Sequence, residues 1–355
     1  MNGRIRSRMR QADISRLLGV SQSTVSLALS GSERISPELS ARIRELAEET
    51  GYLPAPAGPG GPQLITLLVN ENLTESFLPL DLLRGIETGL RKTDWKLQLL
   101  EMPNSIRDSQ EELLQFLRRF AGRAILFGHS HEIPEAVVDL VERQGIAHMW
   151  INTRMPSDCV LPDDRGAARF AVTRLYRLGH RRIGYLRLRH CTHFSGEERC
   201  GGYRDAMREL TGSVDEGLNF SAEIEVDRRL AATMEWLRSF DEPPSAVLCY
   251  GGLEAIVAYT AALRLGLRIP EQFSIVAIHE RLLIEQGVET TTLQVPFFEL
   301  GRRAVEHLIR KLEFPGSTPL PPETIPMIFH PGGTMAPPFE HSSSSEENNK
   351  LQEGL

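Results

Sequence analysis

Side chains able to hydrogen-bond to DNA bases follow a serine near the N-terminus. Ser21 precedes Gln22, Ser23 and Thr24, and Ser26 stands two positions further on. Gln pairs bidentately with adenine, and Ser or Thr hydroxyls bond to bases or phosphates. On a helix these residues would form a polar, uncharged face suited to the major groove. The alternative is the solvated face of a small helical domain.

Two other patterns are weaker candidates for a catalytic, metal-binding or redox site. Residues 128–132, Gly-His-Ser-His-Glu, resemble the turn that presents a nucleophilic serine but lack its final glycine. His129 and His131 allow weak metal binding in an extended chain, or simply form a loop. The four cysteines form no CxxC pair, so thiols are expected, with Cys191 and Cys200 able to pair only as a redox sensor. We expect no enzyme activity, catalytic residue, cofactor or metal.

Two short helices separated by a glycine must position the polar residues. The first covers residues 13–18, and Gly19 ends it. Its apolar face consists of Ile14, Leu17 and Leu18. Ser21 is a favourable N-cap for the second helix, residues 22–29.

A third helix begins at Ser36 and Pro37, an order typical of helix N-termini. Its predicted buried residues are Leu39, Ile43, Leu46 and Ala47. Three short helices with a glycine turn between the first two are typical of a helix-turn-helix DNA-binding domain.

A linker separates this domain from the rest. Residues 54–62 contain four prolines and three glycines, which excludes a helix or a central strand. We therefore predict four parts. They are a headpiece at 1–52, a Pro/Gly linker at 53–63, a core at 64–335 and a disordered tail at 336–355.

Charge is divided unequally among these parts. The net charge of −7, from 40 basic and 47 acidic residues, argues against a general nucleic-acid coat protein. Residues 1–52, however, hold eight arginines against six acidic residues, and the remainder is acidic. DNA contact is therefore expected from the headpiece. The alternating arginines before residue 11 form either a phosphate-binding arm or a solvated tail; they are Arg4, Arg6, Arg8 and Arg10.

Apolar runs alternate with amphipathic segments from residue 64 onward. Strands are predicted at residues 64–69, 124–127, 148–151, 183–186, 246–250 and 274–278, and helices at 80–91, 134–144, 166–178 and 253–265. This alternation indicates parallel sheets covered by helices on both faces. Ligands in such folds bind at the carboxyl ends of strands.

Composition is that of a soluble globular protein, with 41% hydrophobic and 25% charged residues. The sequence shows neither an apolar signal segment at its start nor a run of about 20 apolar residues. We expect a cytoplasmic protein with no membrane partner.

The headpiece resembles that of the lactose/galactose-repressor (LacI/GalR) family. The similarity covers residues 13–31, DISRLLGVSQSTVSLALSG, and continues in ISPE at 35–38 and GYLP at 51–54. It implies that Gln22 and Ser23 read bases, while Thr24 and Ser26 position the helix through phosphates. Ser21 belongs to the same DNA-binding set.

The headpiece also departs from the family. Leu27 stands where a basic residue is usual, and Ser30 where Asn is usual. Both remain expected DNA-binding positions, Leu27 through a thymine methyl, and Arg10 joins them from the arm. The family's short hinge helix, which wedges a leucine into the minor groove, cannot form from residues 54–62. Without that helix, the linker would only tether a pair of headpieces, and their combined avidity for DNA would depend on how far the linker reaches.

The resemblance extends through the core. It rests on LRGIE at 83–87, LGHRRIGY at 178–185, RCGGY at 199–203, LGLRIPE at 265–271, TTLQVP at 291–296 and ELGRRAV at 299–305. It implies an α/β core like periplasmic binding proteins, with two parallel-sheet lobes beside a small all-α headpiece. A sugar- or nucleoside-binding cleft would lie between the lobes.

The implied effector-contacting positions are Leu78, Asn152, Arg199, Gly252 and His279. Arg199 matches the arginine that holds the effector; the alternative is a surface salt bridge. Gly251-Gly252 stand where Asn-Asp is common, His279-Glu280 replace an acidic pair, and Asn152 and Pro162 each replace an Asp. Fewer carboxylates make a neutral sugar less expected. An acidic metabolite and a vestigial pocket both remain open.

The function that we predict is a sequence-specific transcription regulator, a repressor acting as a homodimer on a pseudo-palindromic operator of double-stranded DNA. A sugar-like or acidic small molecule would modulate it. Two alternatives remain: a solute-binding-like protein with an idle headpiece, and a regulator that needs no effector. Effector, operator and the choice between dimer and tetramer stay open.

Overall fold

The computed structural model describes residues 11–29, 34–49, 63–70, 78–106, 109–128, 135–189, 193–285, 287–314 and 318–338. These residues fall into two compact units. The first lies within Met1–Val160 and Gly301–Pro322, and the second within Leu161–Leu300 and Glu323–Leu355. The headpiece has an apolar core of its own.

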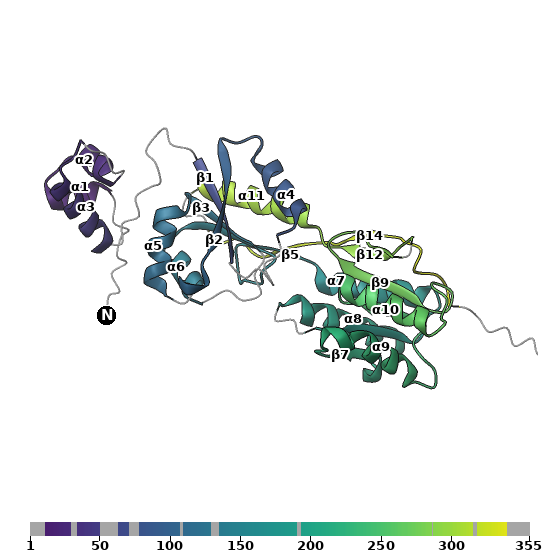
Figure 1. The fold of residues 1–355 in the computed structure, drawn as a ribbon. Helices are drawn as coiled ribbons and strands as arrows, with labels where there is room; N and C mark the ends of the chain where they lie inside the picture. The colour runs from purple at the N-terminus through teal and green to yellow at the C-terminus, as the bar shows by residue number, and fades with distance from the viewer. Residues whose placement is uncertain are drawn as a thin grey trace, which may run out of the picture. The chain divides into compact units, whose positions relative to one another are not determined.

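The headpiece consists of the three predicted helices. They are α1 (Gln11–Leu18), α2 (Gln22–Leu29) and α3 (Pro37–Glu49) (Figure 1). Their buried core comprises Ile14, Val25, Ala28, Ile43 and Ala47, with Leu39 and Leu46 partly buried against it. Gly19 has φ +66°, the left-handed conformation predicted for the end of the first helix.

The prediction that Leu17 faces the core is wrong, because its side chain is 62% exposed. Residues 17 and 18 lie on opposite sides of residue 14, about 100° apart around the helix axis. The core contacts Ile14 and Leu18, so Leu17 turns toward solvent.

The first sheet has the strand order β13-β5-β4-β3-β1-β2. The strands are β1 (Gln63–Asn70), β2 (Trp95–Met102), β3 (Ala124–Phe127), β4 (Ala147–Ile151), β5 (Cys159–Pro162) and β13 (Glu323–Ile325). Neighbours from β2 to β5 pair in parallel. The accompanying helices are α4 (Leu80–Leu90), α5 (Gln110–Phe120), α6 (Glu135–Gln144) and α11 (Phe297–Glu313), with a 3-10 turn at Asn104–Ile106.

The second sheet has the strand order β14-β12-β9-β8-β6-β7. The strands are β6 (Ile183–Arg187), β7 (Asn219–Ser221), β8 (Ala246–Cys249), β9 (Ser274–His279), β12 (Thr291–Gln294) and β14 (Ile328–His330). Only the β12–β14 pair is antiparallel among the strand pairs of this sheet that the structure describes. Two parallel-sheet units confirm the fold class predicted from strand–helix alternation.

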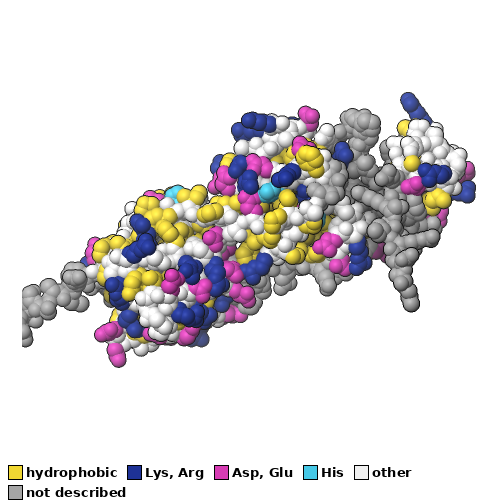
Figure 2. Space-filling view, turned by 180° about the vertical axis from the view of Figure 1, so that it is seen from behind, with side chains coloured by type: hydrophobic (Ala, Val, Ile, Leu, Met, Phe, Trp, Pro, Cys, Tyr) yellow, Lys and Arg dark blue, Asp and Glu magenta, His cyan; other side chains and the backbone are white. Residues whose placement is uncertain are grey.

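Four helices flank the second sheet. They are α7 (Asp164–Arg177), α8 (Ser195–Thr211), α9 (Arg229–Arg238) and α10 (Gly252–Arg264). The smaller elements are 3-10 turns at Glu216–Leu218 and Val226–Arg228 and a hairpin of β10 (Ile284–Glu285) with β11 (Val288–Glu289). In the space-filling view, Lys and Arg alternate with Asp and Glu over the visible face of this unit (Figure 2).

The predicted tail begins too early. Ala336 packs against the second unit, where its carbonyl oxygen accepts hydrogen bonds from His180 Nε2 at 2.9 Å and Ser274 Oγ at 3.1 Å. The described chain runs on to Pro338, which lies beside Gly179. Thr334 is buried and Ala336 is hydrogen-bonded within the second unit, so the ordered core extends past residue 335. Residues 339–355 lie outside the described part.

Several other predictions also fall outside that part. They concern the N-terminal arginines, Ser30, His129, His131, Cys191 and residues 53–62 of the linker. Among the helices that are described, none is long and apolar enough to cross a membrane.

Candidate DNA-binding and effector sites

The N-terminus of α2 is organised by the Ser21 hydroxyl. Ser21 Oγ accepts a hydrogen bond from the Thr24 backbone N–H at 3.0 Å, as an N-cap does. It also lies 2.7 Å from Ser23 Oγ and 2.8 Å from Thr24 Oγ1. The cap therefore fixes the start of α2 and links three hydroxyls into one cluster.

The polar face of α2 is turned toward solvent. Ser21, Gln22 and Ser23 are exposed, Thr24 and Ser26 are half-buried, and Leu27 is 36% exposed. Val25 and Ala28, on the other face, are fully buried. The first turn of α2 thus presents an uncharged hydrogen-bonding surface, the arrangement by which a recognition helix reads bases. Arg10 and Ser30 lie outside the described residues.

In the second unit, Arg199 is held inside the protein. Its Nε donates to Asp164 Oδ1 at 2.6 Å and its Nη1 to the Tyr250 carbonyl oxygen at 2.6 Å. The guanidinium also lies 4.7 Å from the centroid of the Tyr250 ring. The Arg199 side chain is only 11% exposed and that of Asp164 1%. The alternative of a surface salt bridge is therefore wrong.

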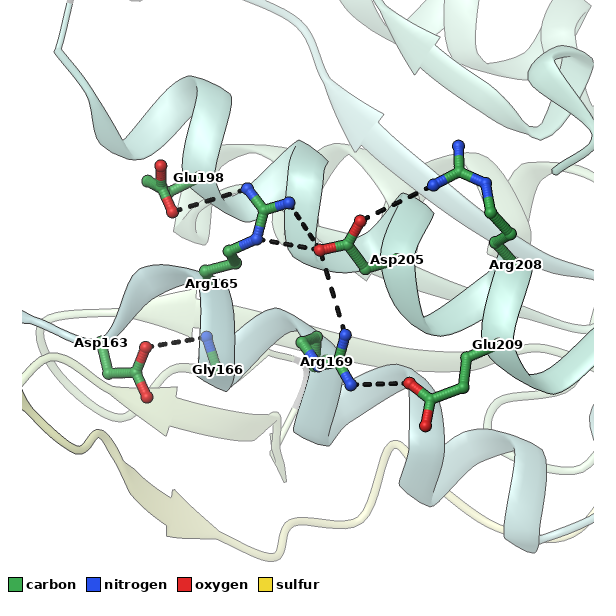
Figure 3. A network of polar contacts seen from close by, with 8 residues as sticks. All are labelled: Asp163, Arg165, Gly166, Arg169, Glu198, Asp205, Arg208 and Glu209. Carbon is green, nitrogen blue, oxygen red and sulfur yellow. Dashed lines mark hydrogen bonds and ion pairs between the residues drawn. The ribbon is translucent and has the colours of Figure 1, made fainter.

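Packing of α7 on α8 brings Asp164 to Arg199. Gly202 lets the helices approach, because a Cβ there would lie 2.3 Å from the Arg165 carbonyl oxygen. Exposed ion pairs continue the contact (Figure 3). They join Arg165 to Glu198 and Asp205, and Arg169 to Asp205 and Glu209, while Arg208 pairs with Asp205 within α8. The buried Asp164–Arg199 pair is thus the innermost contact in a series along both helices.

A chain of buried hydroxyl and imidazole groups lies next to Arg199. Ser195 Oγ is 2.9 Å from His193 Nδ1 and 2.9 Å from the Tyr250 hydroxyl. All three side chains are at least nine-tenths buried. They come from the start of α8 and the end of β8, at the carboxyl edge of the sheet, where α/β folds bind ligands.

His279, at the end of β9, fills the space above Gly252. A Cβ at Gly252 would lie within 3.0 Å of three atoms of the imidazole, so a side chain there would displace the ring. Burial, followed by the field of Arg281, Arg199 and Arg189, lowers the pKa of His279 to about 4. His279 is therefore neutral at physiological pH. Gly252 contributes space rather than a contacting group.

The predicted effector positions divide between the two units. Arg199, Gly252 and His279 come together at the carboxyl edge of the second sheet. In the first unit, Asn152 follows β4 with φ +53° and donates its backbone N–H to Val160, and Leu78 precedes α4. The sequence analysis did not predict four further residues of this edge: Asp164, Ser195, Tyr250 and Glu254. Their positions near predicted helix starts or strand ends are the only sequence feature that could have indicated them.

The cysteines and possible metal ligands of the described residues were the other candidates for chemistry. Cys159, Cys200 and Cys249 are buried thiols. Burial raises the pKa of the Cys159 and Cys249 thiols, which makes them poor nucleophiles. No cluster of three or more His, Cys, Asp or Glu suited to a metal occurs among the residues that were placed.

Comparison with known families finds matches for two parts of the chain. Residues 12–55 match the model of bacterial regulatory proteins of the lacI family, and residues 172–334 match a periplasmic binding protein-like domain. The first match covers the Ser21-capped helix and the second the Arg199 site. Residues 12–55 therefore form a LacI-family DNA-binding domain. Joined to a periplasmic binding protein-like core, this domain makes the chain a DNA-binding regulator modulated by a small molecule.

Curated LacI-family relatives match over most of their length. The transcriptional repressor CytR of Escherichia coli K12 is 25% identical over 317 residues, 85% of this chain and 89% of CytR. The ribose operon repressor of Haemophilus influenzae is 25% identical, covering 85% and 92%.

Solved LacI-family structures share the fold. A complex of the regulator CelR with cellobiose has a TM-score of 0.64 at 22% identity, covering 92% of this chain and all of that one. The lac repressor dimer bound to operator and an anti-inducer has a TM-score of 0.62 at 16% identity, covering 93% and 100%.

Proposed function

We propose that this protein is a sequence-specific transcription repressor that binds a pseudo-palindromic operator as a homodimer. The exposed Gln22 and Ser23 at the capped N-terminus of α2 are the observation that carries the proposal. One headpiece buries too little DNA for high specificity, so two are needed, and two-fold symmetry makes the operator palindromic. Relatives named as repressors support the sign of regulation.

Each residue of the predicted DNA-binding set has its own proposed contact. Gln22 and Ser23 contact base edges, and Leu27 contacts a thymine methyl. Ser21, Thr24, Ser26, Ser30 and Arg10 contact phosphates or neighbouring groups and set the register of the helix. This set contains one arginine, so specificity rests mainly on uncharged contacts.

Selection of bound duplexes from random DNA tests the proposal. The purified full-length protein should enrich a palindrome whose half-sites lie about one helical turn apart, or a multiple of it. Its affinity should fall with salt, with a log–log slope of about −0.9 for each neutralised phosphate. Recovery of no common sequence, or binding that ignores salt, would overturn the proposal.

The effector is proposed to bind at the carboxyl edge of the second sheet through Arg199 and His279, with Gly252 providing space. Substituting Arg199 by Lys keeps the charge but removes the planar fork, and should abolish the effector's influence on operator binding while DNA binding persists. An unchanged effector response in Arg199→Lys would remove this residue from the site.

A further inference from the structure

Several arginine side chains lie at the carboxyl edge of the second sheet. Arg189, just after β6, lies 5.3 Å from the centroid of the Tyr250 ring, over which Arg199 also lies at 4.7 Å. Arg281 follows β9. Its field, with those of Arg189 and Arg199, acts on the pKa of His279 and of Glu280. Three arginines therefore surround one place in the fold.

A fourth arginine ends β6. Arg187 stands two residues after Tyr185, so the two side chains lie on the same face of the strand. Arg187 and Arg199 both exert a field on the Tyr185 hydroxyl. The Nε of Arg187 and the hydroxyl of Tyr185 are buried, and neither has a hydrogen-bond partner among the described residues. Two buried donors thus remain unsatisfied beside Arg199.

The carboxylates nearby do not balance these arginines. Asp164 pairs with Arg199 at 2.6 Å, and Glu254 Oε1 lies 3.9 Å from Arg189 Nε. Glu280 is the third acid. Asp163 and Glu198 also act on the pKa of Asp164, but Asp163 accepts from the Gly166 N–H and Glu198 pairs with Arg165. Within the described chain Arg187 and Arg281 form no ion pair, so their guanidinium groups are available to an anion.

Two carboxylate oxygens at the same edge lack partners. Asp164 Oδ2 and Glu254 Oε2 are buried, and no described residue donates to either atom. Glu254 Oε2 points at the turn before α10, where a Cβ on Gly251 would lie 3.2 Å away. Carboxylate oxygens accept hydrogen bonds from hydroxyl groups. The edge therefore offers acceptors for hydroxyls as well as donors for an anion.

We propose that this edge recognises a hydroxylated anion, a polyol bearing a carboxylate or phosphate group, and that Arg187 and Arg189 select the anionic group. The guanidinium fork matches both groups bidentately. Asp164 and Glu254 accept the hydroxyls. This inference rests on the proposed effector site and names the chemical class that it takes.

Thermal denaturation and titration calorimetry of the full-length protein test the inference. The probes are glucose, gluconate and glucose-6-phosphate, the corresponding ribose compounds, and inorganic phosphate against chloride at equal ionic strength. At least one anionic compound should bind about tenfold more tightly than its neutral parent, as expected for a charge-assisted contact. The gluconate and phosphate arms distinguish the two anionic groups. Equal binding of neutral and anionic compounds, or no stabilisation by any anion, would overturn the inference.

Variants locate the preference. Arg187→Gln and Arg189→Gln should each reduce the preference for the anion about tenfold. The matched control is Arg264→Gln, which removes the same charge from an exposed position at the opposite end of α10 and should retain the preference. The Arg189 side chain is 48% exposed, so its variant should fold even if Arg187→Gln does not. An unchanged preference in Arg189→Gln contradicts the assignment.

Operator binding without ligand, measured on the same proteins, separates this inference from the proposed function. Wild-type protein that binds its operator but shows no preference for anions refutes the ligand class alone. Wild-type protein that selects no operator refutes the proposed function, whatever it does with anions.

Discussion

Gln22 is the side chain that we propose to read a base of the operator. It is exposed in the first turn of α2, while the next buried residue, Val25, anchors the same helix in the headpiece core. Its amide has a donor and an acceptor side by side, which match the N7 and N6 groups of adenine. A charged residue at the same place would add affinity for all DNA without such discrimination.

Substitution of Gln22 by Ala should therefore weaken binding to the selected operator by about 1–3 kcal/mol and relax the preference at one base pair. Affinity for random DNA should change little, because phosphate contacts remain. Fluorescence anisotropy with both duplexes measures the two affinities. Gln110→Ala, an exposed position in α5 outside the headpiece, is the control. Equal losses on both duplexes would contradict base reading.

At the scale of elements, α2 depends on its cap and α7 on its packing against α8. Ser21 satisfies the Thr24 N–H that an eight-residue helix would otherwise leave to solvent. Between α7 and α8, the buried ion pair and the exposed ion pairs differ in what they contribute to stability. The exposed pairs are solvated and contribute little to stability. Loss of either partner of the buried pair would leave an uncompensated charge inside the protein.

Ser21→Ala should destabilise the headpiece by about 1 kcal/mol, and Ser21→Asp should restore most of the loss because Asp also caps helices. Chemical denaturation followed by helical circular dichroism gives the change. Full stability in Ser21→Ala would show that the cap is dispensable.

Asp164→Asn should cost about 3–5 kcal/mol, because it leaves the Arg199 guanidinium buried without its counter-charge. Asp205→Asn, which breaks exposed pairs of the same two helices, should cost less than about 1 kcal/mol. Denaturant titration of both variants measures the difference. Similar costs would mean that burial of the Asp164–Arg199 pair does not govern its contribution.

At the scale of the whole molecule, buried neutral histidines link stability to pH. His180 lies between Ser245 Oγ, at 2.8 Å, and the Ala336 carbonyl oxygen, at 2.9 Å, and so fastens residues 334–338 to the second unit. Burial lowers its pKa and, as the largest effect, also those of His148 and His279. Each imidazole is therefore harder to protonate in the folded protein than in the unfolded chain.

Stability should be complete above the ordinary histidine pKa of about 6.5 and should fall as the pH drops below it, because the unfolded chain then binds more protons. For His279 the loss should continue to about pH 4. Denaturation midpoints measured from about pH 7.5 to pH 5 test this direction, before carboxyl groups dominate. His180→Asn should reduce the slope. A midpoint that rises on acidification would contradict the expectation.

Local signals in the sequence determined much of the architecture. The spacing of apolar residues and the capping residues predicted the three headpiece helices. Apolar runs predicted the bounds of six strands to within one or two residues, namely β1, β3, β4, β6, β8 and β9. These features depend on neighbours three or four positions apart, so they can be read from the chain. The exposed polar surface of α2 followed from them, since capping by Ser21 and burial of Val25 leave Gln22 and Ser23 exposed.

Only the tertiary structure decided the chemistry around Arg199. Asp164 stands 35 positions before it and Tyr250 51 positions after it, yet both contact its guanidinium. Arg187, Arg189, Glu254 and Arg281 join them because parallel strands deliver their carboxyl ends to one edge. The order of strands in the sheet, which no local pattern encodes, decides which residues meet there. The sequence alone therefore predicted the exposed polar face of α2, and the tertiary structure brought together the arginines and carboxylates of the proposed effector site.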